Sequence, residues 1–160
     1  MLQNKIYLNF TKEILKTFFV ILFGLTIIAW TVRAVNFLDL IVDNGYSIPT
    51  YFNYAILNLF GILTKFIPLS FLIALIIFII KKKQDSEFLI LWTSGIKKLK
   101  IVNLFFVISL IILTVYLFFS IFITPLALNK SRSLINNEGY NSFLPTIRVQ
   151  QFSDSFKGFT

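Results

Sequence analysis

The sequence has no cysteine and no histidine, and only seven of its 160 residues are acidic. These absences exclude a disulfide framework, a cysteine nucleophile, an imidazole base and a Cys/His zinc site. Charged residues are scarce too, at 14%, against roughly 25% in an average soluble domain. Hydrophobic residues make up 57% of the chain, more than a water-soluble fold of this length can bury. The composition therefore predicts an integral membrane protein.

The net charge of +8 comes from short lysine clusters that lie beside apolar runs. An excess of basic residues this large is typical of nucleic-acid-binding proteins. Here the lysines lie at the ends of the apolar runs, where they set the orientation of a membrane protein, so we expect no nucleic acid partner. Lysines precede the first apolar run and recur within 81–100, whereas the loop 39–49 has none. By the positive-inside rule, the N-terminus and 81–100 are predicted to be cytoplasmic.

Three apolar runs are long enough to cross a hydrocarbon layer of about 30 Å. We predict transmembrane helices at about 17–40, 51–80 and 101–125, with Pro125 near the exit of the third helix from the membrane. The predicted fold class is all-α and integral to the membrane, with residues 1–128 as its membrane domain.

The residues after 128 have a different character, because polar residues increase and apolar residues begin to alternate. The alternation at 146–150 is typical of a strand. About 30 residues cannot supply a core of their own. Residues 129–160 are therefore predicted to be the incomplete beginning of a β domain on the outer side, with a poorly ordered tail as the alternative.

Between the two lysine clusters, residues 85–95 are predicted to form a short amphipathic cytoplasmic helix. Asp85 or Ser86 can cap its start, Glu87 lies in its first turn, and Gly95 suits the position just past its end. The apolar residues expected on one face are Phe88, Leu89, Leu91 and Trp92. Two interpretations stay open, a plain interfacial turn and a docking helix for a cytosolic partner.

Two cations interrupt the apolar runs. Counted from the cytoplasmic edge of each span, Arg33 lies roughly 24 Å and Lys65 roughly 22 Å along its helix, so both are predicted at similar depth in the outer leaflet. Charges within a membrane are candidates for function, and the planar guanidinium of Arg33 suits phosphate oxygens. The alternative is that both side chains snorkel to ordinary lipid headgroups.

Four short motifs give the chain a family likeness: Ile67-Pro68-Leu69, Asp85-Ser86-Glu87, Thr93-Ser94-Gly95-Ile96 and Thr124-Pro125-Leu126-Ala127. With three helices around them, they resemble the N-terminal half of the LptF/LptG (YjgP/YjgQ) lipopolysaccharide-export permeases, with the LptF side preferred. The resemblance implies an ABC-type exporter subunit with six transmembrane helices and a periplasmic β-jellyroll between the third and fourth. The chain stops where that domain should begin, so it is expected to be a fragment.

The resemblance also implies partners and sites. The partners are an LptB-like cytosolic ATPase dimer, the paired LptF or LptG subunit, LptC-like and LptA-like periplasmic bridge proteins, and lipopolysaccharide. Segment 85–95 matches the coupling helix that docks on the ATPase, with Glu87 as its acidic contact. The expected docking residues are Asp85, Ser86, Glu87, Phe88, Leu91, Trp92 and Gly95. Arg33 matches a basic position facing the lipopolysaccharide cavity, and Lys65 joins it as a lipid-phosphate candidate through its depth alone.

In this interpretation the chain is not an enzyme, needs no cofactor and lies in the bacterial inner membrane. Two other classes stay open. One is a small membrane scaffold or assembly protein in which 81–100 only sets the topology. The other is a membrane enzyme of lipid metabolism that uses Asp or Glu with a metal, although the seven acids form no close cluster on one helix face.

Overall fold

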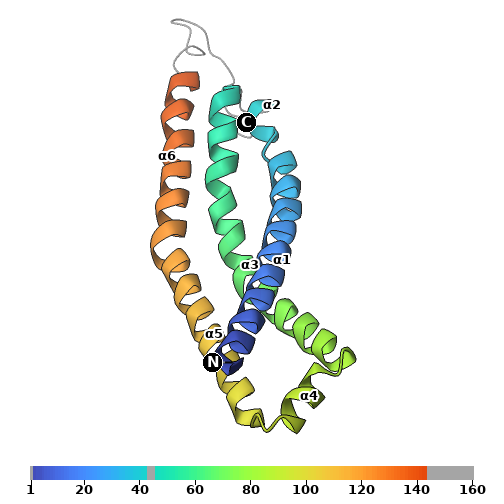
Figure 1. Ribbon diagram of the computed structural model, residues 1–160. Helices are drawn as coiled ribbons and strands as arrows, with labels where there is room; N and C mark the ends of the chain where they lie inside the picture. Colours follow the sequence, from blue (N-terminus) through green and yellow to red (C-terminus); the bar gives the residue numbers. More distant parts are fainter. Residues whose placement is uncertain (1, 43–45, 144–160) are drawn as a thin grey trace, which may run out of the picture.

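The computed structural model describes residues 2–42 and 46–143, and these are helical apart from short connections (Figure 1). The helical segments, in chain order, are α1 (Leu2–Asn36), α2 (Asp39–Val42), α3 (Ile48–Gln84), α4 (Glu87–Thr93), α5 (Lys98–Phe118), the π-helical turn η1 (Phe119–Ile123) and α6 (Thr124–Phe143). Segments α5, η1 and α6 follow one another without a break and form one long helix. The arrangement is a bundle of three long helices with two short connecting ones.

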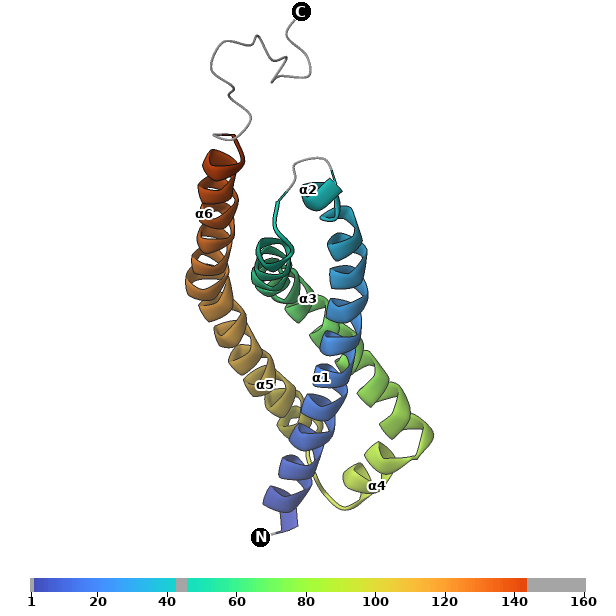
Figure 2. The ribbon, with the colours of Figure 1, turned by 90° about the horizontal axis from the view of Figure 1, so that it is seen from above.

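Among the described residues, three stretches are long and apolar enough to cross a membrane, namely Lys5–Val42, Ile48–Gln84 and Lys98–Asn137. The predicted all-α fold with three membrane-capable helices is therefore confirmed. The start of α1 lies at the same end of the bundle as α4, and α2 lies at the opposite end with the end of α6 (Figures 1 and 2). The two lysine-rich segments thus share one end, as the topology prediction requires.

The long helices extend beyond the predicted boundaries. The first begins at Leu2 and not near residue 17, because Phe10 and Ile14 continue its buried face. The third continues as a helix through Pro125 to Phe143, and the exit from the membrane near Pro125 stays a prediction. Proline is tolerated here because it is the second residue of α6, directly after the π turn, where the hydrogen-bond pattern already changes. Residues 129–143, expected to begin a β domain, are thus helical; the strand predicted at 146–150 lies outside the described residues.

Helices α1 and α3 pack antiparallel along most of their length. Their contacts, taken from the α4 end to the α2 end, are Phe10 with Phe78, Phe18 with Phe71, Trp30 with Ala55, and Ala34 with Tyr51. The first two are edge-on ring pairs. In the others, the Trp30 indole N–H and the Tyr51 hydroxyl each donate a 2.8 Å hydrogen bond to a backbone carbonyl of the facing helix. These contacts fix the register of the two helices.

Helix α6 is held to α3 by polar side chains. The hydroxyls of Thr64 and Thr124 lie 2.9 Å apart, and the Asn58 amide donates a 2.9 Å hydrogen bond to the Ser131 hydroxyl. Both Asn58 and Ser131 are buried. In a lipid bilayer, burial of apolar surface between helices contributes little to their association. Hydrogen bonds between polar side chains, such as these, stabilise the association instead.

Candidate docking helix and membrane cations

The turn that leads into α4 is made by the backbone. Asp85 N–H donates to the Lys81 carbonyl at 3.0 Å and Ser86 N–H donates to the Lys83 carbonyl at 3.2 Å, which ends α3. Ser86 then takes a left-handed conformation (φ 56°) and makes no side-chain capping bond. Of the two predicted caps, Ser86 occupies the N-cap position of α4 but makes no side-chain capping bond, and Asp85 instead follows the end of α3.

The other end of α4 follows the prediction. Gly95 has φ +85°, its N–H donates to the Trp92 carbonyl, and the N–H of Ile96 donates to the Leu91 carbonyl, both at 3.1 Å. This hydrogen-bond pair, with the side chains of Leu91 and Ile96 both buried, is the Schellman motif. The glycine expected just past the helix end is confirmed there.

Gly95→Ala is expected to lower the free energy of unfolding by about 1 kcal/mol, because alanine strains a positive φ. Space does not limit this substitution, since no atom lies within 4 Å of an added Cβ. Gly24 has the same empty surroundings but lies inside α1, so Gly24→Ala is the matched control and should be neutral or stabilising. Thermal unfolding in detergent compares the two variants. Equal losses would show that the φ of Gly95 does not matter.

One buried lysine joins α4 to the two helices beside it. The Lys82 ammonium on α3 lies 2.8 Å from Oε2 of Glu13 on α1 and 2.9 Å from Oε1 of Glu87 on α4. Lys82 is only 4% exposed, and its ammonium sits 5.3 Å and 5.6 Å from the ring centroids of Phe10 and Phe78. A single cation thus pairs with two carboxylates from different helices against aromatic faces.

Sequence reasoning missed this role of Lys82 and treated the three adjacent lysines alike, as a signal of topology. A signal was present, because the buried residues of α3 recur at helical spacing and the repeat reaches the lysine cluster: Ile67, Ser70, Ala74, Phe78 and Lys82. The consequence for Glu87 is direct. The carboxylate expected to contact a partner is engaged within the chain by Lys82.

The apolar residues of α4 point in several directions and not to one face. Leu91 is buried against the bundle, whereas Leu89 and Ile90 are each 61% exposed. Phe88 and Trp92 stack on one another with ring centroids 6.1 Å apart, and the Lys98 ammonium of α5 lies 4.6 Å from the Trp92 ring. The most exposed apolar residues of α4 are therefore Leu89 and Ile90, and neither was among the expected docking residues, whereas Trp92, which was, is 41% exposed.

Arg33 and Lys65 are both exposed, but they do not lie at the same level along the pair of helices α1 and α3. Phe18 packs against Phe71, so Lys65, which precedes Phe71 by six residues in the antiparallel helix α3, is level with about residue 24 of α1. Arg33 lies nine residues beyond that level, which is roughly 14 Å along the helix. The count that gave the two cations similar depth took residues 17 and 80 as level with one another, whereas the register of the helix pair offsets them; depth in the membrane itself stays a prediction. Lys65 belongs to the middle of the helix pair and Arg33 to the end near α2.

The described residues hold no set of ligands for a metal ion. Within 2–42 and 46–143, no group of three or more Asp, Glu, His or Cys side chains comes together. The geometry of this part of the chain therefore gives no support to a metal-dependent lipid enzyme.

Comparison with known proteins agrees with the fold. The family model described as "Lipopolysaccharide export system permease LptF/LptG" matches residues 9–158. The chain is also 26% identical over 151 residues to a protein of Rickettsia prowazekii (strain Madrid E) described as "Uncharacterized protein RP871". That similarity covers 94% of this chain and 42% of the relative, so the chain spans about two fifths of the length of the relative. With nearly all of its residues matched, this multi-pass membrane chain belongs to the LptF/LptG family of lipopolysaccharide export permeases.

Proposed function

We propose that the chain supplies three membrane helices of a permease subunit in an ABC-type exporter. This exporter extracts lipopolysaccharide from the inner membrane and passes it to a periplasmic bridge. Membership of the family supports the role. The proposed partners are an LptB-like ATPase dimer in the cytosol, a second LptF or LptG subunit, and LptC-like and LptA-like bridge proteins. ATP is hydrolysed on the ATPase, and the chain moves lipid without covalent chemistry of its own.

The geometry of α4 is the observation that carries the proposal. This helix lies outside the three membrane-capable spans, between α3 and α5, and leaves Leu89 and Ile90 exposed. Its inner side is held by buried Leu91 and by the Glu87–Lys82 ion pair. Helix α4 thus has an exposed apolar surface and an inner side that is bound to the bundle, which suits a coupling element. A partner docked on α4 can displace α3 directly, and α1 through the contact of Lys82 with Glu13.

The proposed orientation places the N-terminus and α4 in the cytosol, and α2 and the end of α6 in the periplasm. The lysine clusters at the α4 end support this orientation. Residues beyond the described part of α6 are proposed to begin the periplasmic β-jellyroll of the family. Arg33, near the periplasmic end of α1, is proposed to bind a lipopolysaccharide phosphate, with Lys65 deeper in the same pair of helices.

Ile90→Ser tests the docking role of α4. Burial of one isoleucine at an interface contributes about 1.5–3 kcal/mol, so its loss should weaken co-purification of the ATPase about tenfold while membrane insertion persists. Glu87→Lys, which should also lose the ATPase, is less informative because it breaks the ion pair with Lys82. Ile90 makes no such pair and is 61% exposed.

Val42→Ser is the matched control for that test. Val42 is an exposed β-branched residue in α2, at the opposite end of the bundle, so its replacement should leave ATPase binding unchanged. An Ile90→Ser complex that retains the ATPase as well as the Val42→Ser complex would remove α4 as the docking element. The scaffold interpretation of the chain would then be favoured.

A further inference from the structure

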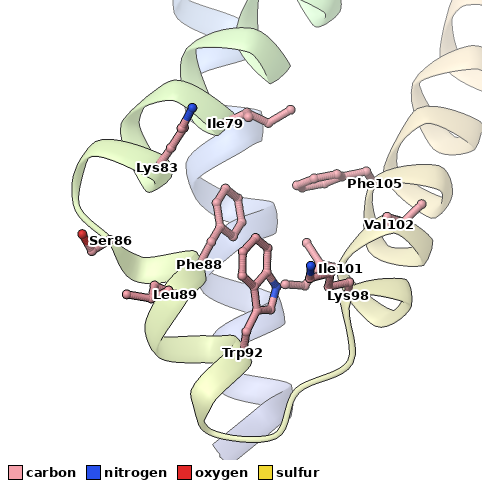
Figure 3. Close-up of a pocket in the computed structure, with 10 residues that line it drawn as sticks. All are labelled: Ile79, Lys83, Ser86, Phe88, Leu89, Trp92, Lys98, Ile101, Val102 and Phe105. Carbon is pink, nitrogen blue, oxygen red and sulfur yellow. The ribbon is translucent and has the colours of Figure 1, made fainter.

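A pocket of about 630 Å³ lies between the end of α3, helix α4 and the first turns of α5 (Figure 3). Its volume falls within the range of about 300–1,000 Å³ that is typical of sites for small organic ligands. The lining is mostly apolar: Phe88 and Trp92 project from α4, while Ile79 of α3 and Phe105 of α5 lie across from them (Figure 3). The interior of this pocket suits a hydrocarbon chain.

Two lysines give the same pocket a positive charge. Lys83 and Lys98 line it from α3 and α5, and its lining contains no acidic residue. The two preceding lysines, Lys81 and Lys82, are both paired with Glu13. Within the part of the chain that the structure describes, no carboxylate lies within ion-pair distance of Lys83 or Lys98. The pocket therefore combines an apolar interior with two cations that lack a counter-charge from the described helices.

The position of the pocket explains why both properties occur together. Ile79 is the last residue but one of the long apolar run of α3, and three lysines begin two residues after it. On α5 the order is reversed, since Lys98 and Lys100 precede the uncharged run that contains Phe105. The pocket thus straddles the level at which hydrocarbon gives way to lipid headgroups. Basic pockets between transmembrane helices at this level recognise anionic headgroups.

We propose that this pocket binds an anionic phospholipid of the cytoplasmic leaflet. The headgroup phosphate pairs with the ammonium groups of Lys83 and Lys98. An acyl chain packs against the rings of Phe88, Trp92 and Phe105. This site goes beyond the proposed export role, because it lies at the opposite end of the bundle from Arg33 and binds a resident lipid. The lipid would fill the space between α4 and α5 and hold α4 at the membrane surface.

Photo-crosslinking tests the site in the full chain, reconstituted in phosphatidylcholine vesicles with trace phosphatidylglycerol that carries a diazirine in its acyl chain. We expect labelled peptides from the pocket lining, with labelling displaced by unlabelled phosphatidylglycerol but not by added phosphatidylcholine. One lysine near a membrane surface contributes about a fivefold change in binding. Lys83→Gln and Lys98→Gln should each lower labelling by about that factor.

Two further variants separate this site from general contact with lipid. Lys100→Gln is the matched control, since Lys100 is an exposed lysine in the same turn of α5 that does not line the pocket, and its labelling should equal that of the wild type. Val102→Phe keeps both lysines but narrows the pocket, and it should also lower labelling. Equal labelling by a phosphatidylcholine probe, or labelling unaffected by Lys83→Gln and Lys98→Gln, would overturn the proposal. Neither outcome depends on ATPase docking or on lipopolysaccharide transport.

Discussion

Lys82→Met is expected to lower the free energy of unfolding by about 1.5–3 kcal/mol, the net contribution of a hydrogen bond to a charged group such as the one from Lys82 to Glu87. Methionine fills the space of the lysine stem between Phe10 and Phe78 but supplies no cation. Glu13 and Glu87 then lose the ammonium that both of them contact. Chemical unfolding in detergent measures the loss, and binding of the ATPase should fall too because α4 is no longer tied to α1.

Two variants make this result specific to the buried cation. Lys81→Met removes an adjacent lysine whose side chain is 59% exposed, and an exposed ion pair contributes only about 0–1 kcal/mol. Adding Glu13→Gln and Glu87→Gln to Lys82→Met should recover much of the stability, because the two carboxylates that lost Lys82 are then neutral and Lys81, which loses Glu13, is exposed to solvent. Similar losses for Lys82→Met and Lys81→Met would show that burial gives Lys82 no special role.

Arg33→Ala is expected to weaken photo-crosslinking of lipopolysaccharide to α1 by tenfold or more. Arg33 is the only charged residue between Lys16 and Asp39, and it is exposed near the α2 end. Its guanidinium can hold a phosphate with two hydrogen bonds, and such a charge-assisted contact contributes about 1.5–3 kcal/mol. The measurement uses the complex with the ATPase and the paired subunit assembled, so that loss of assembly is not mistaken for loss of lipid binding.

Arg33→Lys tests the geometry of the same contact. It keeps the positive charge but not the planar pair of donors, so it should retain part of the crosslinking. If the assembled alanine variant crosslinks as well as the wild type, Arg33 only anchors α1 by snorkelling to ordinary headgroups.

The three spans and the end of α4 could be predicted from the sequence because each depends on local chemistry. A long run of apolar residues without charge can form few stable structures other than a transmembrane helix. The same holds for Gly95. A helix often ends in a residue with left-handed backbone conformation, and glycine adopts that conformation with little strain. These features need no knowledge of what lies opposite.

The features that could not be predicted from the sequence depend on how the helices pack against one another. Lys81, Lys82 and Lys83 are the same residue type in a row, and only the rotation of α3 against α1 decides which one is buried. Register is likewise a property of the pair: the packing of Phe18 on Phe71 places Lys65 in mid-span, and neither helix alone contains that information. For the same reason, the division of α4 into buried and exposed apolar sides could not be derived from its spacing.

The π turn at Phe119–Ile123 has a consequence for the angular phase of the third long helix. The buried positions of α5 include Ile108 and Ile112, and a regular repeat of 3.6 residues would continue them to roughly residues 126 and 130. The buried residues are instead Ala127 and Ser131, one position later, which is the offset that a single π turn inserts. If the turn became regular α-helix with no residue removed, Ser131 would rotate by about 100° away from α3, whereas deleting one residue from the turn would give an ordinary α-helix with Ser131 still facing α3. The irregular turn therefore acts as an angular spacer, which keeps both halves of one helix facing the same neighbour.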